Sequence, residues 1–136
     1  MESLDYVRKL FENSAFNQHL NIKTDIFEAG NVRCTLHIKD HHLNVNEAVH
    51  GGVLFSLLDS VMGATIRSKA GSPLVTVNMS VHYLAAVFAG EKLTARAEIT
   101  HLGRSLVTAE GFLEGEDGLL KTKAIGTFKL LKKRIQ

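Results

Sequence analysis

The segment 51–69 is apolar on nearly every side when it is drawn as a helix, and this feature constrains the fold more than any other. Its apolar members are Val53, Leu54, Phe55, Leu57, Leu58, Val61, Met62, Ala64 and Ile66. A helix that is apolar all round has to be buried by other elements. Gly71 and Pro73 end it, because glycine tolerates the turn and proline cannot continue a helix. The sequence therefore predicts a long central helix with the rest of the chain wrapped around it.

One stripe of this helix differs, because its members are small or polar: Gly52, Ser56, Asp59, Ser60 and Gly63. Their spacing of i, i+4, i+7, i+8 and i+11 places them on one face. Asp59 is the carboxylate of this stripe, and we expect it to be buried. A buried carboxylate is costly unless a partner or a function requires it. Asp59 is therefore the first candidate for chemistry; the alternative is a structural hydrogen bond to Ser56 or to a strand hydroxyl.

Hydrophobic periodicity on both sides of the helix predicts the other elements. Residues 3–13 have the spacing of a short amphipathic helix, and 20–26 and 32–38 alternate as two strands of a hairpin around Gly30. We expect residues 40–49 to be a loop. After the helix, four strands of an antiparallel meander are predicted at 74–84, 91–102, 104–114 and 119–131. The order of elements predicts an α+β fold with one long helix and a sheet of about six strands.

The first strand after the helix carries polar residues on one of its two faces. Alternation predicts that Val75, Val77, Met79 and Val81 point one way. It predicts that the opposite face carries Thr76, Asn78, Ser80 and His82.

Length and composition exclude several classes of protein. The 136 residues contain no linker or repeat, so we expect a single domain over 1–136, with a helical segment at 1–14 and a basic tail at 132–136. The net charge of +2 does not favour a nucleic-acid partner, and no stretch reaches the ~18 apolar residues of a membrane span. The early acids and the lone Cys34 fit neither a signal peptide nor a disulfide framework, so we expect a cytoplasmic protein.

Motifs of metal and cofactor chemistry are missing from the sequence. His41 and His42 follow Asp40, but no third ligand stands at a convincing spacing, so we expect no metal. A lone cysteine excludes a cysteine-based zinc site, and the phosphate-loop, dinucleotide-binding and HExxH motifs are absent. The absence of Gly-x-Ser-x-Gly leaves a serine-hydrolase triad unsupported.

The motif Asn44, His50-Gly51-Gly52 and Asp59, opening an apolar helix, resembles the hotdog-fold acyl-CoA thioesterases of the phenylacetic-acid-degradation type. The resemblance spans residues 15–131 and includes the order of the elements. It implies an antiparallel sheet wrapped around the central helix. It also implies a homodimer whose sheets join edge to edge, a homotetramer of two such dimers, and active sites at the dimer interface.

The resemblance also assigns roles to residues by position. Asp59 matches the catalytic carboxylate, and Thr76 matches a hydroxyl position on the following strand. The residues around the thioester are matched by Asn44, His50, Gly51 and Gly52. Asn78 is a candidate for a substrate contact, and the turn residues Arg104 and Ser105 are candidates for contacts to coenzyme A, which belongs to the substrate. No separate cofactor is implied. Relatives often have glycine where this chain has Glu47.

Thioester hydrolysis explains why these residue types are needed. Asp59 can act as a general base on water or as a nucleophile, and the sequence leaves both open. The first amides of a helix lack intrahelical partners, so Gly51 and Gly52 can polarise the thioester carbonyl. Arg104 offers the positive charge that the phosphates of coenzyme A require.

Two other functions and the nature of the acyl group stay open at this point. The fold also hosts hydratases and dehydratases of acyl thioesters, and a non-catalytic acyl-CoA binding or sensing module would keep the same pocket. Aromatic, short-chain and medium-chain acyl groups are all compatible with the sequence. Candidates for an acyl tunnel, which are equally ordinary core residues, are Phe55, Leu58, Met62 and Phe88.

Overall fold

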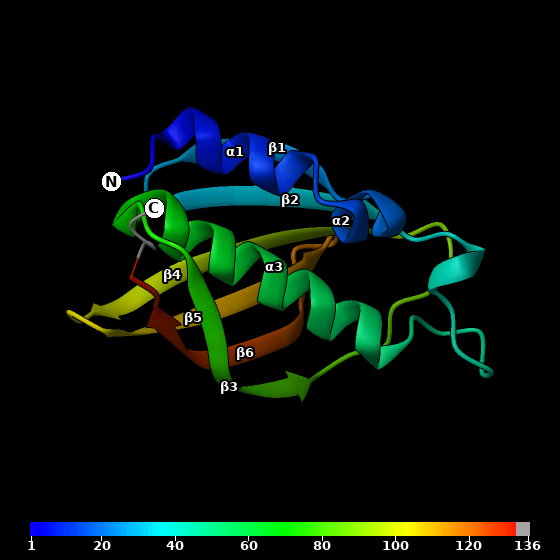
Figure 1. The fold of residues 1–136 in the computed structure, drawn as a ribbon. Helices are drawn as coiled ribbons and strands as arrows, with labels where there is room; N and C mark the ends of the chain where they lie inside the picture. Colours follow the sequence, from blue (N-terminus) through cyan, green and yellow to red (C-terminus); the bar gives the residue numbers. More distant parts are fainter. Residues whose placement is uncertain (133–136) are drawn as a thin grey trace.

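The computed structural model describes residues 1–132, in which a long helix lies across one face of an antiparallel sheet (Figure 1). The helices are α1 (Leu4–Glu12), α2 (Ala15–Leu20) and α3 (Gly51–Ala70), and a 3₁₀ turn, η1 (Asp40–His42), precedes α3. The strands are β1 (Lys23–Glu28), β2 (Asn31–His37), β3 (Leu74–Tyr83), β4 (Lys92–Leu102), β5 (Leu106–Gly115) and β6 (Leu120–Leu130). The predicted fold class, a long central helix with a six-stranded antiparallel sheet, is confirmed for this part of the chain.

The strand order is β1-β2-β4-β5-β6-β3, so β1 and β3 form the two edges of the sheet. β3 follows α3 directly in the chain but pairs with β6. α3 begins beside the end of β3, where Tyr83 Oη donates to the Gly51 carbonyl, and ends beside the β1–β2 turn, where the Gly30 N–H donates to Ser68 Oγ (Figure 1). α1 packs against α3 and β1, and this contact brings the N-terminal segment onto the same face as α3.

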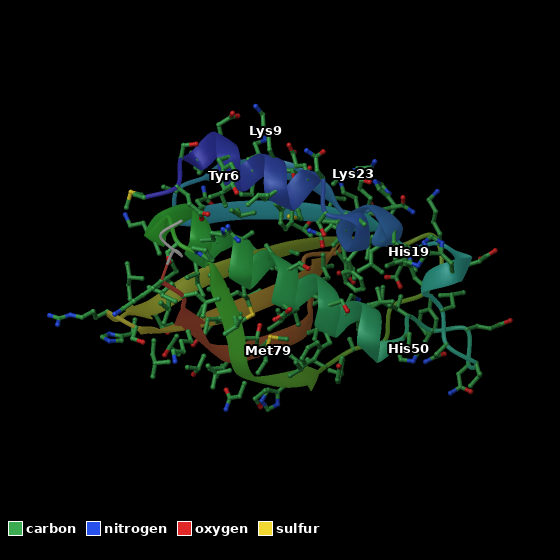
Figure 2. All side chains as sticks on the ribbon, in the orientation of Figure 1. Tyr6, Lys9, His19, Lys23, His50 and Met79 are labelled. Carbon is green, nitrogen blue, oxygen red and sulfur yellow. The ribbon has the colours of Figure 1, made fainter. Side chains whose placement is uncertain are left out.

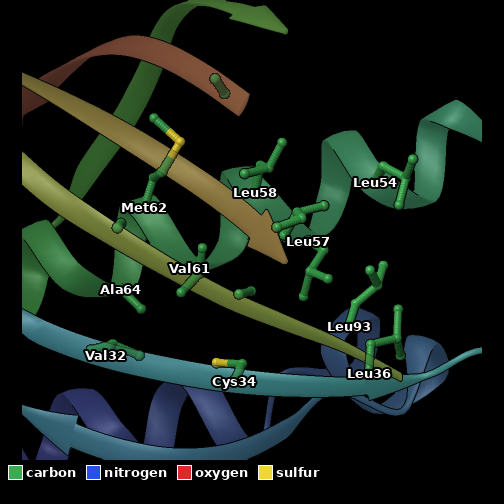
Figure 3. Packing of buried hydrophobic residues seen from close by; sticks show 14 of the residues in the cluster. Val32, Cys34, Leu36, Leu54, Leu57, Leu58, Val61, Met62, Ala64 and Leu93 are labelled. Carbon is green, nitrogen blue, oxygen red and sulfur yellow. The ribbon is translucent and has the colours of Figure 1, made fainter. Parts of the chain in front are cut away.

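The buried side of α3 makes the core with the strands beneath it. Leu57, Val61 and Ile66 are fully buried, and Figure 3 shows residues of α3 facing Cys34 on β2 and Leu93 on β4. α3 ends at Gly71, which adopts the left-handed conformation with φ 64° and donates its N–H to the Arg67 carbonyl at 2.8 Å. Glycine is favoured at this position because it has no Cβ to clash.

The structure differs from the sequence prediction between residues 15 and 22. Leu20 was predicted to open a strand, but it ends α2, and β1 begins only at Lys23. Ser14 caps α2 by accepting the Asn17 N–H at 3.4 Å, and Asn21 ends it in the left-handed conformation. A helix of six residues is too short to show a clear helical periodicity. The alternation of apolar and polar residues that begins at Leu20 therefore predicted a strand instead.

The two ends of the described chain lie close together, because Met1 and Lys132 line the same pocket. The Glu2 N–H also donates to the Gly71 carbonyl at 2.8 Å. The rest of the predicted basic tail, 133–136, lies outside the described residues. Within residues 1–132, no helix combines the length and apolar character needed to cross a membrane.

Candidate active site

Asp59 and Thr76 form the first half of the candidate site. Asp59 lies in the middle of α3, and Thr76 Oγ1 on β3 donates a hydrogen bond to Asp59 Oδ1 at 2.7 Å. The carboxylate was predicted to be buried, but Asp59 is only half-buried and borders an open pocket. One of its oxygens is thus held by a hydroxyl from the sheet, while Oδ2 accepts no hydrogen bond from residues 1–132.

A β-bulge brings Thr76 to Asp59. The pairing of β3 with β6 shifts between Thr76 and Asn78, so Val77 is the extra residue. Thr76 pairs with Phe128, which is buried beneath α3, and it therefore points toward the helix. A bulge reverses the alternation on the strand that carries it.

The bulge corrects the predicted faces of this strand. Thr76 shares the helix-facing side with Met79 and Val81, and not with Asn78 as alternation predicted. Asn78 is exposed on the opposite face of the sheet, so within one chain the structure does not bring it to Asp59.

The pocket beside Asp59 has a volume of about 520 Å³ and is formed by α1, α2, α3, β3 and β6. Its lining residues are Val7, Leu10, Phe11, Ser14, Phe16, Asn17, Asp59, Ser60, Gly63, Ala64, Arg67, Leu74, Val75, Thr76 and Phe128. Three members of the polar stripe, Asp59, Ser60 and Gly63, face this space, as their common spacing predicted. The N-terminal residues of the lining were missed, because no local pattern reveals which helix face will lie beside Asp59.

The four residues considered for an acyl tunnel do not line this pocket. Leu58 and Met62 are fully buried in the core, whereas Phe55 and Phe88 are exposed elsewhere. Cys34 is also in the core, where burial raises the pKa of its thiol to about 12. A thiol that stays protonated at neutral pH is not a nucleophile.

The loop that carries Asn44 forms the second half of the candidate site. Asn44 Oδ1 accepts the backbone N–H groups of Asn46 at 2.8 Å and Ala48 at 3.2 Å. The acceptor end of the side-chain amide therefore holds the loop. Its donor end, Nδ2, has no acceptor within residues 1–132 and is available to a substrate.

Glu47 adopts the left-handed conformation in the same loop, with φ 64°. This conformation costs a residue with a Cβ about 1–2 kcal/mol, and glycine adopts it freely. This left-handed backbone conformation explains why relatives often have glycine at the position of Glu47. The Glu47 side chain is exposed.

His50 and the two glycines lie where α3 begins (Figure 2). His50 Nδ1 accepts the Gly52 N–H at 2.8 Å, so the neutral ring carries its proton on Nε2. This bond takes up one of the two amides that were expected to be open. The Gly51 N–H has no acceptor within residues 1–132, and Tyr83 Oη donates to the Gly51 carbonyl at 3.1 Å.

The two halves of the site are separated along α3. Gly51 and Asp59 are eight positions apart, which corresponds to about 12 Å along a helix. One thioester carbonyl cannot contact both groups of the same chain.

Arg104 and Ser105 lie far from both halves, at the exposed turn between β4 and β5. They line a different pocket, of about 540 Å³, together with Gly71 and Pro73 beyond the C-terminal end of α3. Asp59 is eleven positions from the last residue of α3, or about 17 Å along the axis. Within one chain, the structure therefore separates these candidates from Asp59.

His42 supports the Asn44 loop from the interior. Its ring is fully buried: Nδ1 accepts the Lys39 N–H at 3.0 Å, and Nε2 lies 2.9 Å from the Leu20 carbonyl. The His42 carbonyl also accepts the His50 N–H at 2.8 Å. No group of three or more metal-ligating side chains surrounds it in the described part of the chain. His42 is thus placed as a structural residue that joins α2 to the loop.

We expect His42 to make folding sensitive to acid. Burial lowers the pKa of His42 below its ordinary value; the Leu20 hydrogen bond opposes this, and the charges of His41 and Lys39 add to it. The unfolded chain then takes up the proton at about pH 6.5, before the folded chain does. Stability is therefore present above about pH 6.5 and falls as the pH drops toward the lower folded pKa.

Urea denaturation between pH 7.5 and 5 measures this effect. His42→Gln should make the fall in unfolding free energy with decreasing pH shallower than in the wild type, whereas the exposed His37→Gln should not. Equal slopes in the wild type and His42→Gln would contradict the assignment.

Comparisons with known proteins identify the family of the chain. The model of the thioesterase superfamily matches residues 46–122. The chain is 32% identical over 95 residues to acyl-coenzyme A thioesterase PaaI of Escherichia coli, a match that covers 70% of this chain and 67% of that protein. Across the first curated relatives, the matched segment spans 56–67% of the relative's own length.

Solved structures extend the likeness to nearly the whole chain. The structure of E. coli PaaI has a TM-score of 0.89 at 24% identity, with 98% of this chain and 100% of that chain covered, which establishes the hotdog fold. A thioesterase protein of Streptococcus pneumoniae, solved with coenzyme A, has a TM-score of 0.85 at 28% identity and covers 93% of this chain and 98% of its own.

Proposed function

Since the chain belongs to the thioesterase superfamily, we propose that it is an acyl-CoA thioesterase that hydrolyses a small aryl- or acyl-CoA to the free acid and coenzyme A. The observation that carries the proposal is the Asp59–Thr76 pair beside an open pocket. The relatives named as acyl-CoA thioesterases and the neighbour solved with coenzyme A support the substrate class.

Asp59 is the proposed catalytic carboxylate. Thr76 holds Oδ1, which leaves Oδ2 to take a proton from water or to attack the carbonyl carbon itself. In the first route, the water oxygen bonds to the carbonyl carbon, the carbon–sulfur bond breaks, and the thiolate of coenzyme A takes up a proton. In the second, Asp59 Oδ2 bonds to the carbonyl carbon, the carbon–sulfur bond breaks, and the thiolate of coenzyme A leaves and takes up a proton; water then hydrolyses the anhydride and restores the carboxylate. Both routes give the same products.

The groups that contact the oxygen of the thioester carbonyl are proposed to lie at the beginning of α3. The Gly51 N–H lies at the positive end of the helix dipole, where it stabilises a developing oxyanion. Asn44 Nδ2 is a second donor, because its Oδ1 is already held by the loop. His50 caps the helix through Gly52 and keeps these amides in place.

The proposed site is shared between two chains. Because about 12 Å separates Gly51 from Asp59 along α3, a complete site needs Asp59 of one chain opposite the Gly51 of another. β3 is an edge strand with exposed Val75 and Val77, and it offers a free edge for the predicted edge-to-edge homodimer. The remaining expectations stay predictions. They are the association of two dimers into a homotetramer, the coenzyme A contacts of Arg104 and Ser105, the substrate contact of Asn78, the lack of a separate cofactor, and a cytoplasmic location.

The test is an assay of the purified protein against acetyl-, octanoyl-, benzoyl- and phenylacetyl-CoA, with detection of the released thiol. We expect turnover of at least one thioester by a protein that light scattering shows to be a dimer or larger. Binding of these thioesters without turnover would contradict the enzyme and favour a binding module instead. A monomeric active protein would contradict the shared site.

A further inference from the structure

The N-terminal helices build one wall of the Asp59 pocket. On α1, Val7 and Phe11 are buried against the core, whereas Leu10 is 41% exposed while it lines the pocket. Phe16 on α2 is 54% exposed on the same wall. Fully buried Phe128 lies opposite Thr76 on β6 and also borders the space. Leu10 and Phe16 thus expose apolar surface to the pocket that holds the Asp59–Thr76 pair, beside the polar Ser14 and Asn17.

This wall is anchored to α3 rather than loosely attached. Arg67 donates from Nε and Nη2 to the two Glu2 carboxylate oxygens at 2.8 and 2.7 Å, and the Glu2 side chain is only 2% exposed. Ser60 Oγ donates to Asn17 Oδ1 at 3.1 Å, and Asn17 Nδ2 donates to the Phe11 carbonyl at 3.1 Å. These contacts connect α1 and α2 to the helix that carries Asp59, so the pocket is part of the folded structure.

The chemistry of the wall identifies its occupant. Arg67 is the cation among the described lining residues of this pocket, and Glu2 neutralises it, so residues 1–132 bring no free positive charge here for a phosphate. Covering exposed apolar side chains with an apolar group is favourable, because it removes apolar surface from water. The pocket of about 520 Å³ greatly exceeds the roughly 150 Å³ cavity that holds a benzene ring.

We propose that this pocket holds the acyl group of the substrate, and that Leu10 and Phe16 select aryl and medium-chain acyl groups over acetyl. The inference rests on the proposed function, since a thioester carbonyl at Asp59 places the acyl group against this wall. The preference for one acyl group over another is then set by α1 and α2. These helices lie outside the motif that runs from Asn44 to Asp59.

Four variants test the assignment through the ratio of kcat/KM for octanoyl-CoA to that for acetyl-CoA. Leu10→Ala and Phe16→Ala should each lower this ratio about tenfold, since lost apolar contact of this size changes discrimination by that order. Leu4→Ala is the matched control, because Leu4 is 39% exposed on the same helix but does not line the pocket. It should leave the ratio at the wild-type value.

Gly63→Leu tests the pocket from the opposite wall. A Cβ at Gly63 meets only Leu74, at 3.7 Å, and leucine is a better helix former than glycine, so folding should be retained. The longer side chain fills the space and should lower the same ratio at least tenfold.

A binding measurement separates this inference from the proposed function. Calorimetry on Asp59→Asn protein gives the affinities for octanoyl-CoA and acetyl-CoA without hydrolysis, and Leu10→Ala and Gly63→Leu added to it should lower their ratio. Hydrolysis by the wild type with the same chain-length ratio in every variant would overturn the acyl pocket alone. Absence of hydrolysis with a lowered affinity ratio would overturn the enzyme and support the pocket. Equal affinities for octanoyl-CoA and acetyl-CoA would overturn the acyl pocket, whether or not the wild type hydrolyses either thioester.

Discussion

Asp59→Asn should lower kcat/KM for acyl-CoA hydrolysis by about 10²–10⁴-fold, the usual contribution of a general base. The asparagine has nearly the same shape and still accepts the Thr76 hydroxyl through its oxygen, so the hydrogen bond between α3 and β3 is retained. What is lost is the second carboxylate oxygen, which in the proposed mechanism takes up a proton or attacks the carbonyl. An initial-rate assay of thiol release on the best thioester of the panel measures the effect.

The control is Asp5→Asn, which makes the same chemical change at an exposed position. Asp5 pairs with Lys9 on the surface of α1, and such exposed pairs contribute little. Its kcat/KM should equal that of the wild type. Near-normal turnover by Asp59→Asn, with an unchanged oligomer mass and circular dichroism spectrum, would show that Asp59 is a structural residue.

Phe128→Ala should lower the free energy of unfolding by about 3–5 kcal/mol, because it leaves a cavity where the ring is fully buried. For a chain of 136 residues this corresponds to a fall in Tm of roughly 10–17 °C. The cavity would lie beside Thr76, which pairs with Phe128 across β3 and β6 on the same face of the sheet. The variant should therefore also loosen the position of Thr76 relative to Asp59.

Thermal and urea denaturation followed by circular dichroism measure this loss. Phe16→Ala is the matched control, since Phe16 is 54% exposed, and its removal should change the unfolding free energy by about 0.5 kcal/mol or less. A Phe128→Ala protein as stable as Phe16→Ala would mean that the ring does not support the sheet beneath the site.

Much of the fold is predictable from the sequence because its signals are local. The apolar surroundings of Leu57 and Val61 predicted a buried helix, and alternation predicted all six strands within a few residues of their ends. α2 was missed, because six residues carry too little periodicity to compete with the neighbouring strand. The spacing of Asp59, Ser60 and Gly63 correctly placed them on one face, since helical geometry relates residues on the same element.

The sequence by itself determined the central helix, the strands around it and the carboxylate that faces the pocket, because helix and strand periods are properties of neighbouring residues. Only the tertiary structure decided what surrounds Asp59. The bulge at Val77 turns Thr76 toward the helix, and the packing of α1 and α2 places Leu10 and Phe16 beside the carboxylate. These arrangements depend on strand register and on the contacts of buried surfaces, which join segments far apart in the chain.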